Sequence, residues 1–219
     1  ENFYEKSIMS LAKILDKVPQ KKINKIIYSS SSSIYNSIKE NDFSDKLNRN
    51  IYSSTKLACE NLIKNFCSKN KIFFHITRIF NMYGENDDFS IISKIIKSYK
   101  KNKIIYLNNE GNSVRDFINV NTVSKIYLKL LNLKKSGTID IGSGYGTNIS
   151  DIINKLGKKN FKIKKINFKE QTLSIAQKDV TENTNSKNLE FFLKEKLKLR
   201  KSINFEKIYI NKKNLINDF

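Results

Sequence analysis

The chain has 219 residues, of which 39% are hydrophobic and 11% aromatic, so it can bury a sizeable core and is not a disordered chain. No apolar run approaches the ~20 residues that a membrane-spanning helix needs, so we do not expect a membrane protein. A single histidine excludes a histidine-rich site, and no metal is expected. Cys59 and Cys67 stand about 12 Å apart along one expected helix, which predicts free thiols in a reducing cytoplasm.

The formal net charge of +20 raises the question of nucleic-acid binding. The lysines are spread along nearly the whole chain, and most are interleaved with Asn and Ile, whose codons are also A/T-rich. A coding bias therefore explains most of the charge as solvated surface lysine, and we do not expect nucleic acid as the partner. A basic face for an anionic small ligand is the alternative.

Apolar residues recur at helical and at strand spacing in alternation along the chain. The pattern predicts helices over 4–18, 51–68, 91–100 and 122–133, and strands over 23–29, 72–79, 104–107, 117–120 and 137–141. The strand over 23–29 is almost fully apolar, which is typical of a strand buried on both faces. This order indicates an α/β fold with a largely parallel sheet.

From residue 142 onward the pattern weakens. A helix over 149–156, a strand over 161–168 and a lysine-rich helix over 189–199 are expected. This tail predicts a smaller and more irregular second lobe.

Five consecutive serines, Ser29 to Ser33, continue the first expected strand in "IIYSSSSSIYNS". A serine run is usually a flexible linker, but this one contains no glycine and follows a strand directly. Open α/β sheets bind their ligands at the carboxyl ends of parallel strands. The run is therefore expected at the edge of a ligand crevice.

Tyr52 and Lys56 stand four residues apart in "YSSTK", on one face of the helix expected over 51–68. An ammonium beside a phenol favours the phenolate, so such a pair can act as a general acid/base. Taken alone, the motif also fits a surface tyrosine stacked on a lysine stem. The nearby serine run favours the catalytic interpretation.

Five stretches occur in order: "IIYSSSSSIYN", "YSSTK", "TRIFNMYGENDD", "GNSVRDFINVNTVSKIYLKLL" and "IDIGSGYGTNISDII". Their order, spacing and strand or helix context resemble the motifs of the NAD-dependent epimerase/dehydratase family. These are extended short-chain dehydrogenase/reductases, of which the UDP-glucose 4-epimerase-like enzymes are the nearest. The resemblance covers about residues 2–153. It implies a partial Rossmann-type NAD-binding domain over 1–82 and 117–145, and a substrate-binding lobe over 83–116 and 146–219.

The resemblance implies three catalytic residues. Ser31 would orient the sugar hydroxyl, Tyr52 would be the base, and Lys56 would bind the nicotinamide ribose and favour the phenolate. The implied cofactor is NAD, with NADP as the alternative, and its contacts would be Asn2, Ser29, Tyr52, Lys56 and Phe80. The implied substrate is a nucleotide sugar, and its contacts would be Ser32, Asn81 and Arg115. The arginine suits the diphosphate, which a guanidinium can bind through two parallel hydrogen bonds.

The sequence also departs from the family pattern. The phosphate-binding G-x-x-G-x-x-G is absent and the chain begins with Glu1, so we expect an N-terminally truncated chain that by itself binds NAD poorly. Ser32 and Ser33 stand where sugar 4,6-dehydratases carry an Asp–Glu pair, which favours a sugar 4-epimerase over a dehydratase. Ala176 and Lys178 replace the arginine and glycine of a late family motif that grips the diphosphate.

Several alternatives stay open at this stage. Within the family, the chain could be a reductase or a dehydratase. A non-catalytic remnant that binds anionic partners is another alternative, although the presence of Ser31, Tyr52 and Lys56 favours an enzyme. The stretch "TIDIGSGYGTN" also resembles the glycine loop of S-adenosylmethionine-dependent methyltransferases. A homodimer through the helix over 51–68 and the helix before it is left open.

Two further features have plain structural interpretations. His75 lies in the strand-like "IFFHIT" and is expected to be structural. Glu85, Asp87 and Asp88 are expected to form a solvated acidic turn.

Overall fold

The computed structural model describes residues 3–35, 51–84, 87–101, 103–108, 111–157, 162–166, 173–174, 187–197 and 209–211. The chain divides into two compact units. Unit 1 is formed by Glu1–Ile79 and Tyr127–Asp140, and unit 2 by Phe80–Ile126 and Ile141–Phe219. Helix α5 (Val120–Asn132) passes from unit 2 into unit 1.

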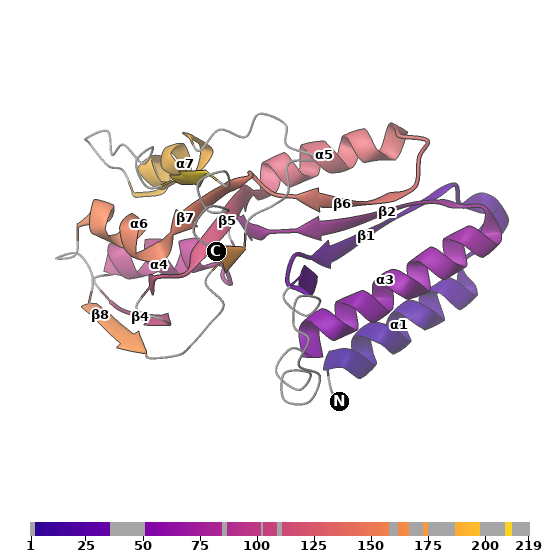
Figure 1. Ribbon diagram of the computed structural model, residues 1–219, viewed down its shortest axis with the longest axis horizontal. Helices are drawn as coiled ribbons and strands as arrows, with labels where there is room; N and C mark the ends of the chain where they lie inside the picture. Colours follow the sequence, from indigo (N-terminus) through magenta and orange to yellow (C-terminus); the bar gives the residue numbers. More distant parts are fainter. Residues whose placement is uncertain are drawn as a thin grey trace. The chain divides into compact units, whose positions relative to one another are not determined.

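Unit 1 is a three-stranded sheet with two long helices. Its elements are α1 (Phe3–Lys17), the short 3-10 helix η1 (Gln20–Lys22), β1 (Lys25–Ser31), α3 (Ile51–Asn70), β2 (Phe73–Ile79), the end of α5 and β6 (Gly137–Ile141). The strand order is β1-β2-β6, and β1 pairs with β2 in parallel. The arrows of all three strands point the same way in Figure 1, so the sheet is parallel and its carboxyl ends share one edge.

The core of unit 1 forms between the two helices and the sheet. Helices α1 and α3 lie side by side, and α3 packs on β1 and β2 (Figure 1). Leu15 of α1, Ile63 and Cys67 of α3, and Ile76 of β2 are buried together. Ile63 and Cys67 are one helical turn apart on α3, and partly buried Phe74 stands two residues before Ile76 on β2, so local periodicity and burial agree here.

Strand β1 differs from its prediction. It begins at Lys25 rather than at Ile23, extends to Ser31, and most of its residues are only half-buried. The expectation of a strand buried on both faces is therefore wrong. The reason is that β1 lies at one end of the described strand order, so only β2 pairs with it.

In its described residues, unit 2 combines a mixed sheet with several helices. Its elements are β3 (Asn81–Tyr83), α4 (Ile91–Lys101), β4 (Ile104–Asn108), β5 (Val114–Asn119), the start of α5, β7 (Tyr145–Asn148), α6 (Ile149–Leu156), β8 (Lys162–Ile166), β9 (Leu173–Ser174), α7 (Lys187–Leu197) and β10 (Tyr209–Asn211). One sheet has the order β10-β7-β5-β3, with β9 also paired to β5, and β4 pairs with β8 in a separate parallel ribbon.

The core of unit 2 gathers residues from α4, α6 and α7 around strands β3 to β5. Tyr83 is 2% exposed and meets Phe192 of α7 edge-on, with 5.1 Å between ring centroids. Ile95 of α4 and Ile152 of α6 are fully buried in the same cluster. The helix predicted over 189–199 is therefore confirmed, as α7, by the burial of its apolar residues.

The predicted α/β fold is confirmed, and the predicted helices all exist within a few residues of their expected bounds. The strand expected over 117–120 instead spans Val114–Asn119, because Val120 already begins α5. The two-to-four-residue strands β3, β7, β9 and β10 were not predicted, since they are too short for a periodic pattern. Among the helices that are described, none is long and apolar enough to cross a membrane.

The acidic turn before α4 is more than solvated surface. The Asp87 carboxylate accepts hydrogen bonds from the backbone N–H groups of Gly84, Phe89 and Ser90 and from the hydroxyls of Ser90 and Ser93. Burial raises the pKa of this carboxyl, but these hydrogen bonds outweigh burial and hold the pKa below its usual value. Asp87 thus organises the start of α4, and its interpretation as a merely solvated residue is wrong.

The rest of the acidic cluster is different. Exposed Asp88 pairs with Lys97 at the surface, as expected of a solvated turn. Glu85 lies outside the described residues.

His75 and the two cysteines are buried in unit 1. Cys59 and Cys67 are free thiols, as predicted. His75 is 1% exposed, and neither of its ring nitrogens has a hydrogen-bond partner among the described residues. Burial, and secondarily the charge of Lys25, lower the pKa of His75. The imidazole is therefore neutral near pH 7, which agrees with a structural role.

Candidate active site

The carboxyl edge of the unit 1 sheet holds the serine run. Ser29 Oγ lies 2.7 Å from the Tyr127 hydroxyl of α5, and that hydroxyl lies 2.6 Å from Thr77 Oγ1 of β2. Lys56 Nζ donates to the Ser29 carbonyl at 3.0 Å. Ser29 and Lys56, which the sequence predicts as cofactor contacts, are therefore brought together.

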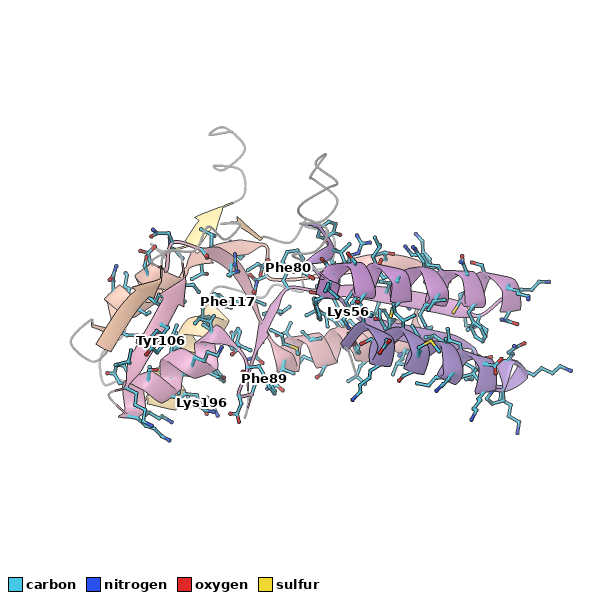
Figure 2. All side chains as sticks on the ribbon, turned by 90° about the horizontal axis from the view of Figure 1, so that it is seen from below. Lys56, Phe80, Phe89, Tyr106, Phe117 and Lys196 are labelled. Atoms are coloured by element: carbon cyan, nitrogen blue, oxygen red, sulfur yellow. The ribbon has the colours of Figure 1, made fainter. Side chains whose placement is uncertain are left out.

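Lys56 lies beside two phenol rings. Its Nζ is 5.8 Å from the ring centroid of Tyr52, on the same helix, and 5.2 Å from that of Tyr28 on β1. Burial lowers the pKa of Lys56, and the neighbouring Cys59 opposes this more weakly. Tyr52 is 43% exposed. The label in Figure 2 marks Lys56 on α3.

Ser31 ends β1, and Ser32 and Ser33 form the turn that follows it. Ser31 Oγ accepts a hydrogen bond from the Ser33 N–H at 3.2 Å, and the Ser32 N–H donates to the Ile79 carbonyl at 3.1 Å. Ser32 is buried, and the buried Ser33 hydroxyl has no partner among the described residues. The run is thus the ordered end of a strand and not a linker.

A buried ion pair that sequence reasoning missed supports this edge. Glu60 of α3 is fully buried and accepts from Ser30 Oγ at 2.7 Å. Arg78 of β2 donates to both of its carboxylate oxygens, at 3.0 and 2.8 Å. Burial raises the pKa of Glu60. The hydrogen bonds from Arg78 and Ser30 lower it by more, so the pKa lies below its usual value. The available signal was that Glu60 stands four residues after Lys56, one helical turn along α3.

Arg78 also connects to the turn after the serines. Its guanidinium lies 4.9 Å from the ring centroid of Tyr35, whose hydroxyl donates to Asp140 Oδ1 at 2.6 Å. Burial, and then the bond to Asp140, raise the pKa of Tyr35, so the phenol stays protonated. Residues from β1, α3, β2 and β6 are thereby held in one hydrogen-bonded and stacked arrangement around the serine run.

Unit 2 holds the other predicted contacts. Phe80 is 6% exposed, and its N–H donates to the Ile141 carbonyl. Asn81 Nδ2 donates to the Asp116 carbonyl at 3.2 Å, and Arg115 Nη1 donates to the Val114 carbonyl at 3.3 Å. Figure 2 labels Phe80. Asn2 lies outside the described residues, as do Ala176 and Lys178.

Asn81 and Arg115 line one groove of about 510 Å³. The lining residues are Asn81, Met82, Phe89, Ser90, Ile91, Lys94, Tyr106, Leu107, Gly111, Ser113, Arg115, Phe117 and Ile149. It therefore combines two cations with two well-exposed rings, Phe89 at 88% and Tyr106 at 55% (Figure 2). Cations suit phosphate and exposed aromatic rings suit a planar base. Lys94, Phe89 and Tyr106 carried no motif that could have marked them in the sequence.

The glycine loop after β6 is occupied by a side chain of the protein. The Asp116 carboxylate accepts from the Ser143 N–H at 2.7 Å, from the Ser143 hydroxyl at 2.6 Å and from the Gly144 N–H at 2.8 Å. In a methyltransferase, such a loop would face the cofactor. Here its donors bind an internal carboxylate, which argues against that alternative.

Comparison with known proteins identifies the family. Residues 1–142 match the NAD dependent epimerase/dehydratase family, and the chain belongs to that family of enzymes. It is 28% identical over 109 residues to dTDP-L-rhamnose 4-epimerase of Burkholderia thailandensis, covering 47% of this chain and 30% of that protein. It is 25% identical over 170 residues to dTDP-D-glucose 4,6-dehydratase of Dictyostelium discoideum, covering 70% and 39%. The chain thus spans well under half of these relatives.

Solved structures support the same fold. UDP-N-acetylglucosamine 4-epimerase of Methanobrevibacter ruminantium, in complex with UDP-N-acetylmuramic acid, superposes with a TM-score of 0.66 at 19% identity, covering 99% of this chain and 71% of that one. UDP-glucuronic acid 4-epimerase of Bacillus cereus, in complex with UDP-glucuronic acid and NAD, superposes with a TM-score of 0.62 at 25% identity, covering 75% and 55%. The Rossmann-type fold inferred from the motifs is confirmed.

Proposed function

We propose that the protein is an NAD-dependent nucleotide-sugar 4-epimerase in which Tyr52 is the acid/base. The observation that carries this proposal is the cluster of Tyr52, Lys56 and Ser29 at the carboxyl edge of a parallel sheet. An exposed phenol beside an ammonium is a suitable proton acceptor, and the edge is where such sheets bind ligands. Family membership supports the reaction class.

Epimerisation is favoured over dehydration because the described residues of this edge offer no carboxyl group suited to the elimination of water. Elimination of water needs a carboxyl acid/base beside the sugar, and Ser32 and Ser33 stand at those positions of the family pattern. Two carboxylates bond to residues of this edge, but Glu60 is held by Arg78 and Asp140 accepts from Tyr35. A carboxylate in a buried ion pair with a depressed pKa is a poor proton donor.

The residues present fit the nicotinamide end of NAD. Lys56 offers a half-buried ammonium next to a strand end, which suits the hydroxyls of a ribose. The remaining proposed contacts are Asn2, Ser29, Tyr52 and Phe80. The 219 residues contain no G-x-x-G-x-x-G for the pyrophosphate, so we expect weak NAD binding by this chain alone. Solved relatives hold NAD, which favours NAD over NADP.

The proposed chemistry assigns one task to each residue. Bound NAD would supply the hydride acceptor and donor for the sugar carbon. Tyr52 takes the proton of the sugar hydroxyl and later gives it back, while Ser31 hydrogen-bonds the same oxygen. Lys56 places its ammonium beside the Tyr52 ring and at the Ser29 carbonyl, where it would bind the ribose. Rotation of the keto-sugar between the two transfers inverts the carbon.

The groove of unit 2 is the proposed binding place of the nucleotide diphosphate. Arg115 and Lys94 would pair with the phosphates, while Tyr106 or Phe89 would stack on the base. Ser32 and Asn81 would contact the sugar. We accordingly propose that unit 1 belongs to the cofactor domain and that unit 2 is the substrate-binding lobe. A homodimer remains a prediction.

The proposal is tested with protein expressed from its complete reading frame. Purified enzyme is given NAD and a panel of UDP- and dTDP-hexoses, and the products are identified by proton NMR. A C4 epimer supports the proposal, whereas a C6 methyl signal beside a 4-keto group would establish a dehydratase. Tyr52→Phe should lower the turnover by about 10²–10⁴-fold, while Tyr4→Phe on α1 is the matched control and should keep it. An unchanged rate in Tyr52→Phe would remove this residue from the mechanism.

A further inference from the structure

A second groove lies at the other end of the unit 1 sheet, where β1 and β2 begin and where α3 and α5 end. It encloses about 550 Å³. Its lining residues are Gln20, Lys21, Ile23, Asn24, Lys25, Asn70, Lys71, Ile72, Phe73, Leu131, Asn132 and Lys134. The strand β1 ends within the serine run at Ser31, which is six residues after Lys25. That distance is roughly 20 Å, so this groove is separate from the proposed active site.

The groove is positively charged. Four of its lining residues are lysines and none is acidic. Helices α3 and α5 both end here, and a helix end carries about half a negative charge, which by itself would attract a lysine. Lys25 fulfils that role, because its Nζ donates to the carbonyls of Leu130 and Leu131 at 2.6 Å and of Leu133 at 2.9 Å. Lys21, Lys71 and Lys134 add charge beyond what the capping of α5 requires.

Lys71 occupies a backbone conformation that lysine disfavours. Its φ is +56°, the left-handed conformation that ends many helices and that glycine adopts without strain. Among the described non-glycine residues, it alone has a positive φ. A lysine here costs folding free energy that glycine would not. Strain that persists at a groove suggests that the side chain has a use.

The other lining residues suit the uncharged part of a ligand. Phe73 is 40% exposed and Leu131 is 58% exposed, so the groove offers an aromatic and an aliphatic surface. The side-chain amides of Asn24 and Asn132 add donors and acceptors. The volume is within the ~300–1,000 Å³ of typical small-molecule sites.

We propose that this groove binds a phosphorylated small molecule of nucleotide size. Its phosphates pair with Lys21, Lys71 and Lys134, and its ring packs on Phe73. The site does not depend on the proposed epimerase activity, since it shares no residue with that machinery. Binding of nucleic acid through a diffuse basic surface is the competing outcome.

The test is calorimetric titration of the whole chain at low salt with inorganic pyrophosphate and with ADP. Lys71→Gly and Lys134→Gln should each raise the Kd of pyrophosphate about fivefold, as expected for loss of one partly exposed charge contact. Lys13→Gln on α1 removes an equal charge outside the groove and should leave the Kd unchanged. ADP should bind more tightly than pyrophosphate, and Phe73→Ala should abolish that difference.

Stability separates a ligand role of Lys71 from a structural one. Lys71→Gly relieves the left-handed strain, so its Tm should rise by about 2 °C while its affinity falls. An equal loss of affinity in Lys13→Gln, or a DNA oligonucleotide that binds equally well to all these variants, would show a diffuse surface and overturn the proposal. Loss of binding only in Arg115→Met would place the anion in the groove of unit 2 and also overturn it.

Discussion

Replacing Arg78 by methionine tests the buried ion pair beneath the serine run. In the native structure Glu60 is fully buried, and Arg78 donates to both of its oxygens. The substitution keeps much of the apolar stem of the side chain but removes both charge-assisted hydrogen bonds. The Glu60 carboxylate is then left in the interior with Ser30 and with Lys64, whose Nζ is 3.8 Å away.

The expected cost follows from the desolvation of the orphaned carboxylate. Removing one partner of a buried pair costs about 3–5 kcal/mol of unfolding free energy. Lys64 is only 35% exposed and can compensate in part, so we expect a value near the lower limit, about 3 kcal/mol. Replacing both partners, as in Glu60→Leu with Arg78→Met, removes the buried charge altogether. The double variant should therefore be clearly more stable than the sum of the two single changes implies.

The assay is urea unfolding followed by far-ultraviolet circular dichroism, because the chain has no tryptophan. The pKa of Glu60 is depressed in the folded protein, so its stabilisation is present above the unfolded value near ~4.3 and is lost as the pH falls through the folded value. The difference in unfolding free energy between wild type and Arg78→Met should accordingly become smaller below about pH 4. A cost below ~1 kcal/mol, or strict additivity in the double variant, would refute a strongly coupled pair.

Three further predictions concern other parts of the chain. In the complete enzyme, Lys56→Met should raise the Kd of NAD, because it removes the ammonium that lies at the Ser29 carbonyl in the proposed ribose site; a Kd equal to that of wild type would contradict this. His75 is buried and its pKa is lower in the folded than in the unfolded protein. As the pH falls below ~6.5, the imidazole is therefore protonated in the unfolded chain before it is protonated in the folded one, and the unfolding free energy should fall. His75→Leu should flatten that part of the stability curve, and an equal slope in both proteins would count against a neutral buried imidazole. Gly84→Ala should cost about 1–3 kcal/mol, since Gly84 has a φ of +144° and an added Cβ would lie 2.7 Å from Val120 Cγ1. Adding Val120→Ala to the Gly84→Ala variant should recover part of the lost stability, measured by thermal unfolding. If none is recovered, the clash with Val120 does not contribute and the loss comes from backbone strain.

Local information in the sequence accounts for much of the fold and for part of the site. Periodic burial predicts α3, α4 and α6 because each helix places its own apolar residues on one side. The spacing of Tyr52 and Lys56 likewise predicts a shared helix face, since four residues make about one turn. The order of the motifs identifies the family, which the match over residues 1–142 confirms.

Only the tertiary structure shows the contacts and grooves that form between residues far apart in the sequence. Lys25 reaches the carbonyls at the end of α5 across 105 to 108 residues, and Tyr35 reaches Asp140 across 105. The two grooves likewise collect residues from several elements, none of which forms a motif by itself. The half-buried state of β1 follows from its position in the strand order, which its own apolar sequence does not encode. Periodicity reports only which side of an element is apolar, whereas packing determines what that side meets and which polar groups lie together around it.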